Sequence, residues 1–139
     1  MLLLVVIGGA YSGKRRFVRG NCKRARWISA YDGCRIEDAG DIEQGQTLIL
    51  EGFEIWLEQL ISSGKSDEEI LLIMKDAITR LASVHQDIVL IMLEIGRGIV
   101  PVKKEDRRLR DLMGWLQQHF VGQAESAVYI WHGLARAMK

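Results

Sequence analysis

The hydrophobic positions of the chain follow two alternating patterns. Short continuous apolar runs, rich in β-branched residues, are typical of strands buried on both faces of a sheet. Segments in which apolar residues recur every three or four positions are typical of amphipathic helices. The runs predict strands at residues 2–7, 26–31, 47–50, 87–93 and 127–131. The periodic segments predict helices at 13–24, 53–61, 66 to near 85, and 105–121, with 32–46 as a surface connection.

This alternation predicts an α/β fold, a mainly parallel sheet with helices on both faces. With 139 residues and 48% hydrophobic content, the chain is long enough for one core, so we expect a single domain over residues 1–139. Ser66 and Glu69 have the spacing of a capping box before the third helix. The apolar positions expected on that helix are Ile70, Leu71, Ile73, Met74, Ala77, Ile78 and Leu81. The inward positions expected on the fourth helix are Leu109, Leu112, Met113, Leu116 and Phe120, and core packing is expected for Trp27, Trp56, Trp115 and Trp131.

Charge is nearly balanced over the whole chain but uneven along it. The formal net charge of +1 gives no reason to expect nucleic acid or an acidic membrane surface as a partner. Residues 14–26 carry seven basic and no acidic side chains, whereas residues 32–58 carry eight acidic side chains against one arginine. No apolar run approaches the roughly 20 residues that a membrane span requires. A basic element beside a turn suits a phosphate ligand.

The cysteines and histidines do not form a recognisable site. Cys22 and Cys34 have no CxxC spacing, so they fit neither a disulfide framework nor a zinc site, and we expect a reducing cytoplasm. The three histidines, 85, 119 and 132, are far apart in sequence. Surface or helix-end roles are therefore favoured over a catalytic or metal trio.

The clearest motif follows the first predicted strand. Residues 8–15 read GGAYSGKR, which fits GxxxxGK between a buried strand and a helix. In such a P-loop the glycines let backbone N–H groups converge on a phosphate, the helix N-terminus adds partial positive charge, and the lysine reaches the outer phosphates. The expected nucleotide-binding residues of the loop are Gly8, Gly9, Ala10, Tyr11, Ser12, Gly13, Lys14 and Arg15. The alternative is an ordinary glycine-rich turn between a strand and a helix.

Arg15 departs from the motif. P-loops place Ser or Thr after the lysine, and its hydroxyl ligates Mg²⁺. Arginine has only donors and stays protonated, so it cannot coordinate a metal. Either Mg²⁺ is held through Ser12, water and a carboxylate elsewhere, or the loop binds phosphate but no longer catalyses well.

Two glutamates follow predicted strands at their carboxyl ends, where ligands bind in sheets of this class. Glu51 follows TLIL and Glu94 follows IVLIML. Either carboxylate could hold Mg²⁺ directly or through water. The alternative is that they are strand-end or helix-capping residues. Lys14, Glu51 and Glu94 are the candidate catalytic residues.

Four segments of the chain resemble one family. They are LLVVIGGAYSGK, LILEGFEIWLEQLI, LEIGRGIVP at 93–101 and RRLRDLMGWLQQ at 107–118. They resemble the adenosylcobinamide kinase / adenosylcobinamide-phosphate guanylyltransferase family of cobalamin biosynthesis. Its members typically show a GGARSGKS loop, a strand ending in Asp-Cys ahead of a Leu-Trp helix, and an NEVGxGIVP turn ahead of an RxFRDxxGxxNQ helix. The last pair is the most specific signal.

The resemblance implies a RecA-like sheet, GTP or ATP as donor, Mg²⁺, a corrinoid acceptor and a trimeric assembly. Residues 8–15 match the family's phosphate loop. Ser29, Ala30 and Tyr31 match the strand end that lines the nucleotide. Glu51 takes the place of the aspartate in Asp-Cys, and Glu94 takes the place of the glutamate in NEVG.

Three departures from the family pattern shape the functional hypothesis. Arg15 replaces the loop serine, and Gly52 replaces the cysteine after the carboxylate. The family also carries a helix after the second strand with a histidine that takes up the guanylyl group, whereas residues 32–46 are short and contain no histidine. We therefore expect a shortened, divergent member: a cobinamide kinase without guanylyltransferase activity, or a degenerate nucleotide-binding protein without turnover.

Overall fold

The computed structural model describes residues 2–40, 45–84, 87–95 and 103–139. Within them lies a six-stranded sheet in the order β2-β3-β4-β1-β5-β6. Its strands are β1 (Leu2–Gly8), β2 (Ala25–Ser29), β3 (Thr47–Glu51), β4 (Asp87–Leu93), β5 (Ser126–Trp131) and β6 (Leu134–Ala137). The first five are parallel, and β6 pairs antiparallel with β5. The apolar run at the N-terminus therefore forms a central strand, as predicted.

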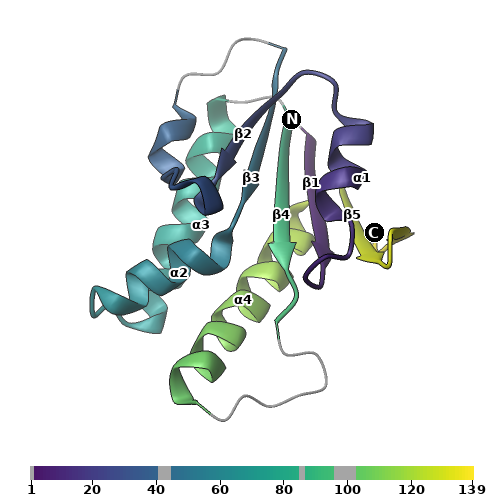
Figure 1. The fold of residues 1–139 in the computed structure, drawn as a ribbon. Helices are drawn as coiled ribbons and strands as arrows, with labels where there is room; N and C mark the ends of the chain where they lie inside the picture. The colour runs from purple at the N-terminus through teal and green to yellow at the C-terminus, as the bar shows by residue number, and fades with distance from the viewer. Residues whose placement is uncertain (1, 41–44, 85–86, 96–102) are drawn as a thin grey trace.

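Helices cover both faces of the sheet (Figure 1). They are α1 (Lys14–Asn21), α2 (Phe53–Ser62), α3 (Asp67–Val84) and α4 (Lys104–Gln123). Side chains alternate between the faces of a strand, so each strand contributes to two apolar layers. Val18 of α1 packs with Val6, Ile49 and Ile91 on one face, while α2, α3 and α4 pack on the other. The predicted α/β, P-loop and RecA-like fold with a mainly parallel sheet is confirmed.

The described residues match the predicted helices closely. The Ser66 hydroxyl accepts the Glu69 N–H and the Glu69 carboxylate accepts the Ser66 N–H, both at 3.2 Å, so the capping box forms at the start of α3. All five predicted inward residues of α4 are buried, whereas Ile73 of α3 is exposed. α1 ends at Asn21 rather than near residue 24, because Cys22 adopts an extended backbone and closes the last turn on the Val18 carbonyl.

Three expectations need correction. Core packing is right for Trp56 but wrong for Trp115 and Trp131, which are 47% and 59% exposed. Trp131 is exposed because it ends β5 near the edge of the sheet, where β6 is the edge strand among the described residues. β6 was not predicted, because all four of its residues are exposed and its sequence, LARA, has no apolar alternation to mark it. In the described part of the expected surface connection, residues 32–40 and 45–46, 3₁₀ turns span Ala30–Asp32 and Ile36–Ala39, and Ala39 is buried.

Candidate functional site

The loop between β1 and α1 lies at the carboxyl end of the sheet and closes tightly over it. A Cβ atom on Gly8 would lie 2.5 Å from Ser12 Oγ and 2.6 Å from the Ile130 carbonyl oxygen, so only glycine fits there. Gly13, before the first residue of α1, has a φ of 99°, a left-handed conformation that glycine adopts without strain. The exposed Tyr11, with a φ of 58°, forms the outer tip of the loop. These backbone constraints account for Gly8 and Gly13, the two glycines of GxxxxGK.

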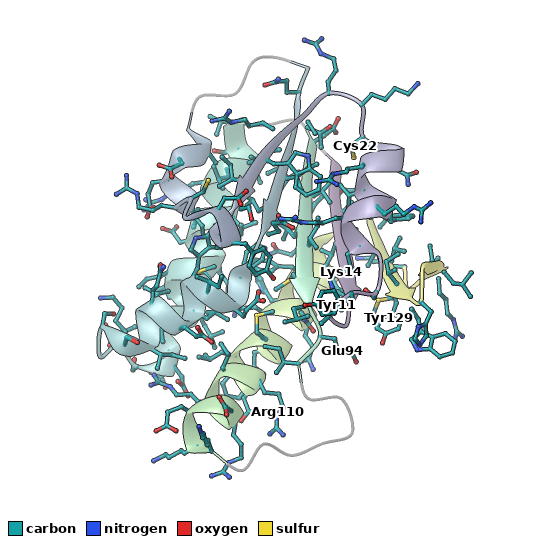
Figure 2. All side chains as sticks on the ribbon, in the orientation of Figure 1. Tyr11, Lys14, Cys22, Glu94, Arg110 and Tyr129 are labelled. Atoms are coloured by element: carbon teal, nitrogen blue, oxygen red, sulfur yellow. The ribbon has the colours of Figure 1, made fainter. Side chains whose placement is uncertain are left out.

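Lys14 folds back over this loop. Its Nζ donates a hydrogen bond to the Gly9 carbonyl oxygen at 2.6 Å, and Figure 2 shows its side chain beside Tyr11 at the end of the sheet. Partial burial lowers the pKa of Lys14, while the negative charges of Glu54 and Glu51 oppose that shift. An ammonium group that is partly desolvated and held at the loop is well placed to meet an anion there.

The hairpin of β5 and β6 supports the loop from outside. The Gly133 N–H donates to the Ser12 carbonyl oxygen at 2.7 Å. A Cβ atom on Gly13 would lie 3.3 Å from Gly133 Cα, so the two backbones nearly touch. This contact was not predicted from the sequence, because it depends on β6.

Arg15 and Glu51 form a bidentate ion pair. Arg15 Nε donates to Glu51 Oε2 at 2.8 Å, and Arg15 Nη2 donates to Glu51 Oε1. The Glu51 side chain is only 2% exposed, and the Arg15 side chain is 46% exposed. Because Glu51 is two residues after Ile49, its carboxylate points to the face on which α1 packs, where Arg15 lies in the first turn of the helix. The hydrogen bond to Glu51 raises the pKa of the Arg15 guanidinium.

A second polar pair adjoins the first. The Tyr31 hydroxyl donates to Glu54 Oε2 at 2.7 Å, and burial together with this bond raises the pKa of Tyr31. Among the described residues, no donor reaches the buried Oε1 atom of Glu54. The Arg15 guanidinium lies 5.9 Å from the centre of the Tyr31 ring. Glu54 was not predicted as a site residue, although its position in the first turn of α2 places it near Glu51 at the end of β3.

These groups surround a cavity of about 820 Å³ at the carboxyl end of the sheet. Its size is within the range of small-molecule sites. Basic and acidic side chains both line it, together with the loop backbone. The lining residues are Ala10, Tyr11, Ser12, Gly13, Lys14, Arg15, Arg16, Arg19, Tyr31, Asp32, Glu51, Glu54, Ile91 and Leu93.

Comparison with protein families identifies the group to which this architecture belongs. The family model CobU, described as cobinamide kinase / cobinamide phosphate guanyltransferase, matches residues 21–138. The chain belongs to this family. A search of curated proteins finds no match to the chain.

Membership in the cobinamide kinase family places the chain in cobalamin biosynthesis, with nucleotides and corrinoids as the small molecules of the family. The match begins in the last turn of α1 and leaves out residues 8–15. The phosphate loop is therefore identified by its own motif and by the geometry described above. In the described part of the chain, no helix is long and apolar enough to cross a membrane.

The structure brings most of the expected nucleotide-binding residues of this family member together. Residues 10–15, Tyr31 and Glu51 line the cavity, and Gly8 and Gly9 form the base of the loop. Ser29 and Ala30 do not line it: both are buried at the end of β2, where Ala30 packs against Gly52. The GIVP turn of the family lies outside the described residues, as does His85.

Glu94 lies apart from Glu51. Its backbone N–H donates to the Gly8 carbonyl oxygen at 2.9 Å, which keeps it next to the loop. Its side chain, however, accepts a hydrogen bond from the Tyr129 hydroxyl at 2.5 Å and lines a separate groove with Arg110 and Trp115. Figure 2 shows Glu94 and Arg110 on that side of the site.

The side chains expected to hold Mg²⁺ do not form a suitable ligand set. Both oxygens of Glu51 are bound by Arg15, and Glu94 lines the other groove. Ser12 Oγ lies against Gly8. Among the described residues, no group of three or more His, Cys, Asp or Glu side chains has a metal-binding arrangement. Mg²⁺ at nucleotide sites is usually held by one or two carboxylates together with water and the phosphates, and neither of the two expected carboxylates faces the loop without a partner.

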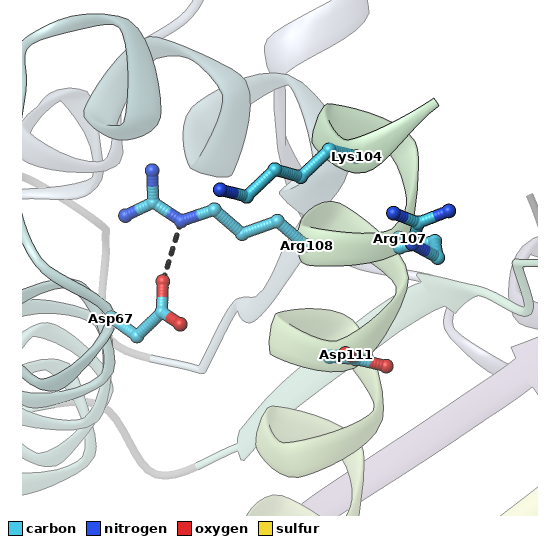
Figure 3. Close-up of a pocket in the computed structure, with 5 residues that line it drawn as sticks. All are labelled: Asp67, Lys104, Arg107, Arg108 and Asp111. Atoms are coloured by element: carbon cyan, nitrogen blue, oxygen red, sulfur yellow. Dashed lines mark hydrogen bonds and ion pairs between the residues drawn. The ribbon is translucent and has the colours of Figure 1, made fainter. Parts of the chain in front are cut away.

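A third cavity lies at the start of α4 (Figure 3), lined by Asp67, Lys104, Arg107, Arg108 and Asp111. Arg108 Nε donates to Asp67 at 2.5 Å, and Arg108 Nη2 donates to the Lys65 carbonyl oxygen at 2.6 Å. Arg108 therefore joins the N-terminal ends of α3 and α4. Its guanidinium is used in packing these helices.

Proposed function

We propose that the chain binds GTP or ATP by its phosphates on the loop at residues 8–15 and transfers the terminal phosphoryl group to a hydroxyl of a corrinoid. Its family membership supports the reaction class. The observation that carries the proposal is the position of Lys14. Its side chain is hydrogen-bonded to the glycine-containing loop and lines a cavity with charged walls. Positive groups fixed around a phosphate stabilise the charge that develops during phosphoryl transfer.

The contacts of Glu51 and Glu94 support roles different from the catalytic roles expected of them from the sequence. Lys14 and the loop N–H groups stabilise charge on the phosphoryl group, as the sequence motif predicts. Glu51 positions Arg15, because both of its oxygens accept from that residue. Glu54 is the better candidate to receive the proton of the acceptor hydroxyl, since it lines the cavity and its Oε2 atom accepts from the neutral Tyr31 hydroxyl rather than from a cation. Glu94 lines the neighbouring groove, and its catalytic role stays a prediction from the sequence.

Loss of the guanylyltransferase activity is part of the proposal. Covalent guanylyl transfer requires a nucleophile that attacks the α-phosphorus and later leaves. The connection at residues 32–46 has no histidine. His132 lies in the β5–β6 turn and His119 near the end of α4, neither of them among the cavity-lining residues.

A second candidate function is nucleotide binding without turnover. The Arg15–Glu51 ion pair favours it, because the pair occupies the side chains that P-loop enzymes use around Mg²⁺. The two candidates share the phosphate loop and differ in whether a phosphorylated corrinoid is formed. The trimeric assembly and the cytoplasmic location expected from the sequence likewise remain proposals, which light scattering and cell fractionation would test.

Nucleotide affinity of the Lys14→Ala variant tests the binding step. Loss of one charge-assisted hydrogen bond should weaken binding by roughly 1.5 to 3 kcal/mol. Lys23→Ala is a matched control, because Lys23 is exposed and does not line the cavity. Calorimetry that finds the same affinity for wild type and Lys14→Ala would remove the phosphate loop from this proposal.

A further inference from the structure

Arg15 occupies the position at which a P-loop enzyme presents a metal-binding hydroxyl. A guanidinium group carries five N–H donors and no acceptor, so it cannot ligate a cation. It can supply positive charge itself. Its side chain lines the cavity together with the residues of the phosphate loop.

Glu51 fixes the guanidinium at the cavity wall. The pair uses Arg15 Nε and Nη2, which form one edge of the planar group. Both carboxylate oxygens are occupied, and Glu51 is almost fully buried. A cation that approached these oxygens would be repelled by the positive charge of Arg15 or would have to displace the guanidinium from its partner. Breaking such a pair is costly because it leaves a buried charge uncompensated.

Among the described residues, no acceptor is bound to the other edge of the guanidinium. Two donors serve Glu51, and the remaining N–H groups belong to a side chain that is 46% exposed and lines the cavity beside Lys14. The planar fork of arginine matches two oxygens of a phosphate group. Arg15 can therefore bind Glu51 with one edge of its guanidinium and a phosphate group with the other edge.

The charges around the cavity support the same conclusion. Four basic side chains line it, Lys14, Arg15, Arg16 and Arg19, against the three acidic side chains Asp32, Glu51 and Glu54. The charges of Arg15 and Glu51 offset each other, which leaves Lys14, Arg16 and Arg19 against Asp32 and Glu54. A phosphate chain that arrives without a metal would thus still meet positive charge from α1.

We propose that this site binds nucleotide phosphates without Mg²⁺: the Arg15 guanidinium, positioned by Glu51, donates hydrogen bonds to phosphate oxygens, and Lys14, Arg16 and Arg19 supply the positive charge. This inference rests on the proposed nucleotide binding and deepens it. It assigns Arg15 as a phosphate-binding residue and Glu51 as its positioning residue. Asp32 and Glu54 face the same cavity and carry no metal in this proposal.

The test is a titration of the full chain with fluorescent GTP and ATP analogues, in excess EDTA and in excess MgCl₂. The wild-type dissociation constant should differ by less than about threefold between the two conditions. A loss of about tenfold or more in EDTA would overturn the inference while leaving nucleotide binding intact. No binding in either condition would overturn the proposed function itself.

Two variants sharpen the result. Arg15→Ser returns a hydroxyl and releases the Glu51 carboxylate, so its affinity should become about tenfold or more higher in MgCl₂ than in EDTA. Arg26→Ser is the matched control, since Arg26 is exposed on β2 outside the cavity and should behave as wild type. If Arg15→Ser binds as tightly as wild type in EDTA, Arg15 does not contact phosphate. If that variant does not fold, the wild-type comparison alone decides the inference.

Discussion

The Arg15–Glu51 pair should contribute measurably to the free energy of unfolding, and a double-mutant cycle isolates that contribution. Arg15→Met removes the guanidinium but keeps much of the side-chain volume. Glu51→Gln removes the negative charge while keeping the shape of the side chain. The coupling energy is the difference between the double variant and the sum of the two single variants.

The magnitude follows from the unequal exposure of the two partners. Breaking a buried ion pair costs about 3 to 5 kcal/mol, whereas an exposed pair contributes only about 0 to 1 kcal/mol. Glu51 is 2% exposed and Arg15 is 46% exposed, so solvent screens one side of the pair. We therefore expect a coupling energy of about 2 kcal/mol, and a loss of about 2 to 3 kcal/mol for Arg15→Met alone because it leaves the Glu51 carboxylate buried and unpaired.

Urea unfolding followed by far-UV circular dichroism measures all four proteins, provided that their m-values agree. The exposed Asp76–Arg80 pair on α3, with an N–O distance of 2.8 Å, gives a control cycle for which about 0.3 to 0.5 kcal/mol is expected. A coupling energy at Arg15–Glu51 no larger than that of the control would refute the reasoning. In that case the ion pair would not hold Arg15 in place.

Three other outcomes are expected. Gly8→Ala should destabilise the fold by about 1 to 3 kcal/mol and weaken nucleotide binding, because its Cβ would clash with Ser12 and with the Ile130 backbone. Gly20→Ala is the control for the unfolding and binding assays, because its Cβ would meet no neighbouring atom, and it should change neither result. GTP labelled on the α-phosphate should leave no protein-bound GMP by denaturing gel and mass spectrometry; a stoichiometric histidine adduct would restore the guanylyltransferase assignment. An NMR titration should give His119 a pKa below 6.5, because burial and the positive charge of Lys75 lower it. Protonation then favours the unfolded chain, so stability should fall as the pH drops through 6.5, and a His119→Gln variant should lose that component.

The sequence predicted the parts of the site that follow from local pattern. A continuous apolar run stopped by glycines predicted both β1 and the loop, and the run TLIL placed Glu51 at a strand end. The pairing of Glu51 with Arg15 was not predicted, because it requires the face of β3 and the rotation of α1 to be known together. Glu54 was missed for a similar reason, since its role depends on Tyr31 from another strand end. β6 and its contact with Ser12 were missed because an exposed edge strand leaves no hydrophobic pattern.

The most direct test of the proposed function is the formation of a phosphorylated corrinoid. Purified protein is incubated with cobinamide and GTP or ATP, in MgCl₂ in one reaction and in EDTA in another. The corrinoids are then separated by chromatography and identified by mass spectrometry. We predict cobinamide phosphate in equal amount to the nucleoside diphosphate released with the wild type, and none with Lys14→Ala. Nucleotide binding without any cobinamide phosphate, in either condition, would contradict the kinase proposal and leave a nucleotide-binding protein without turnover.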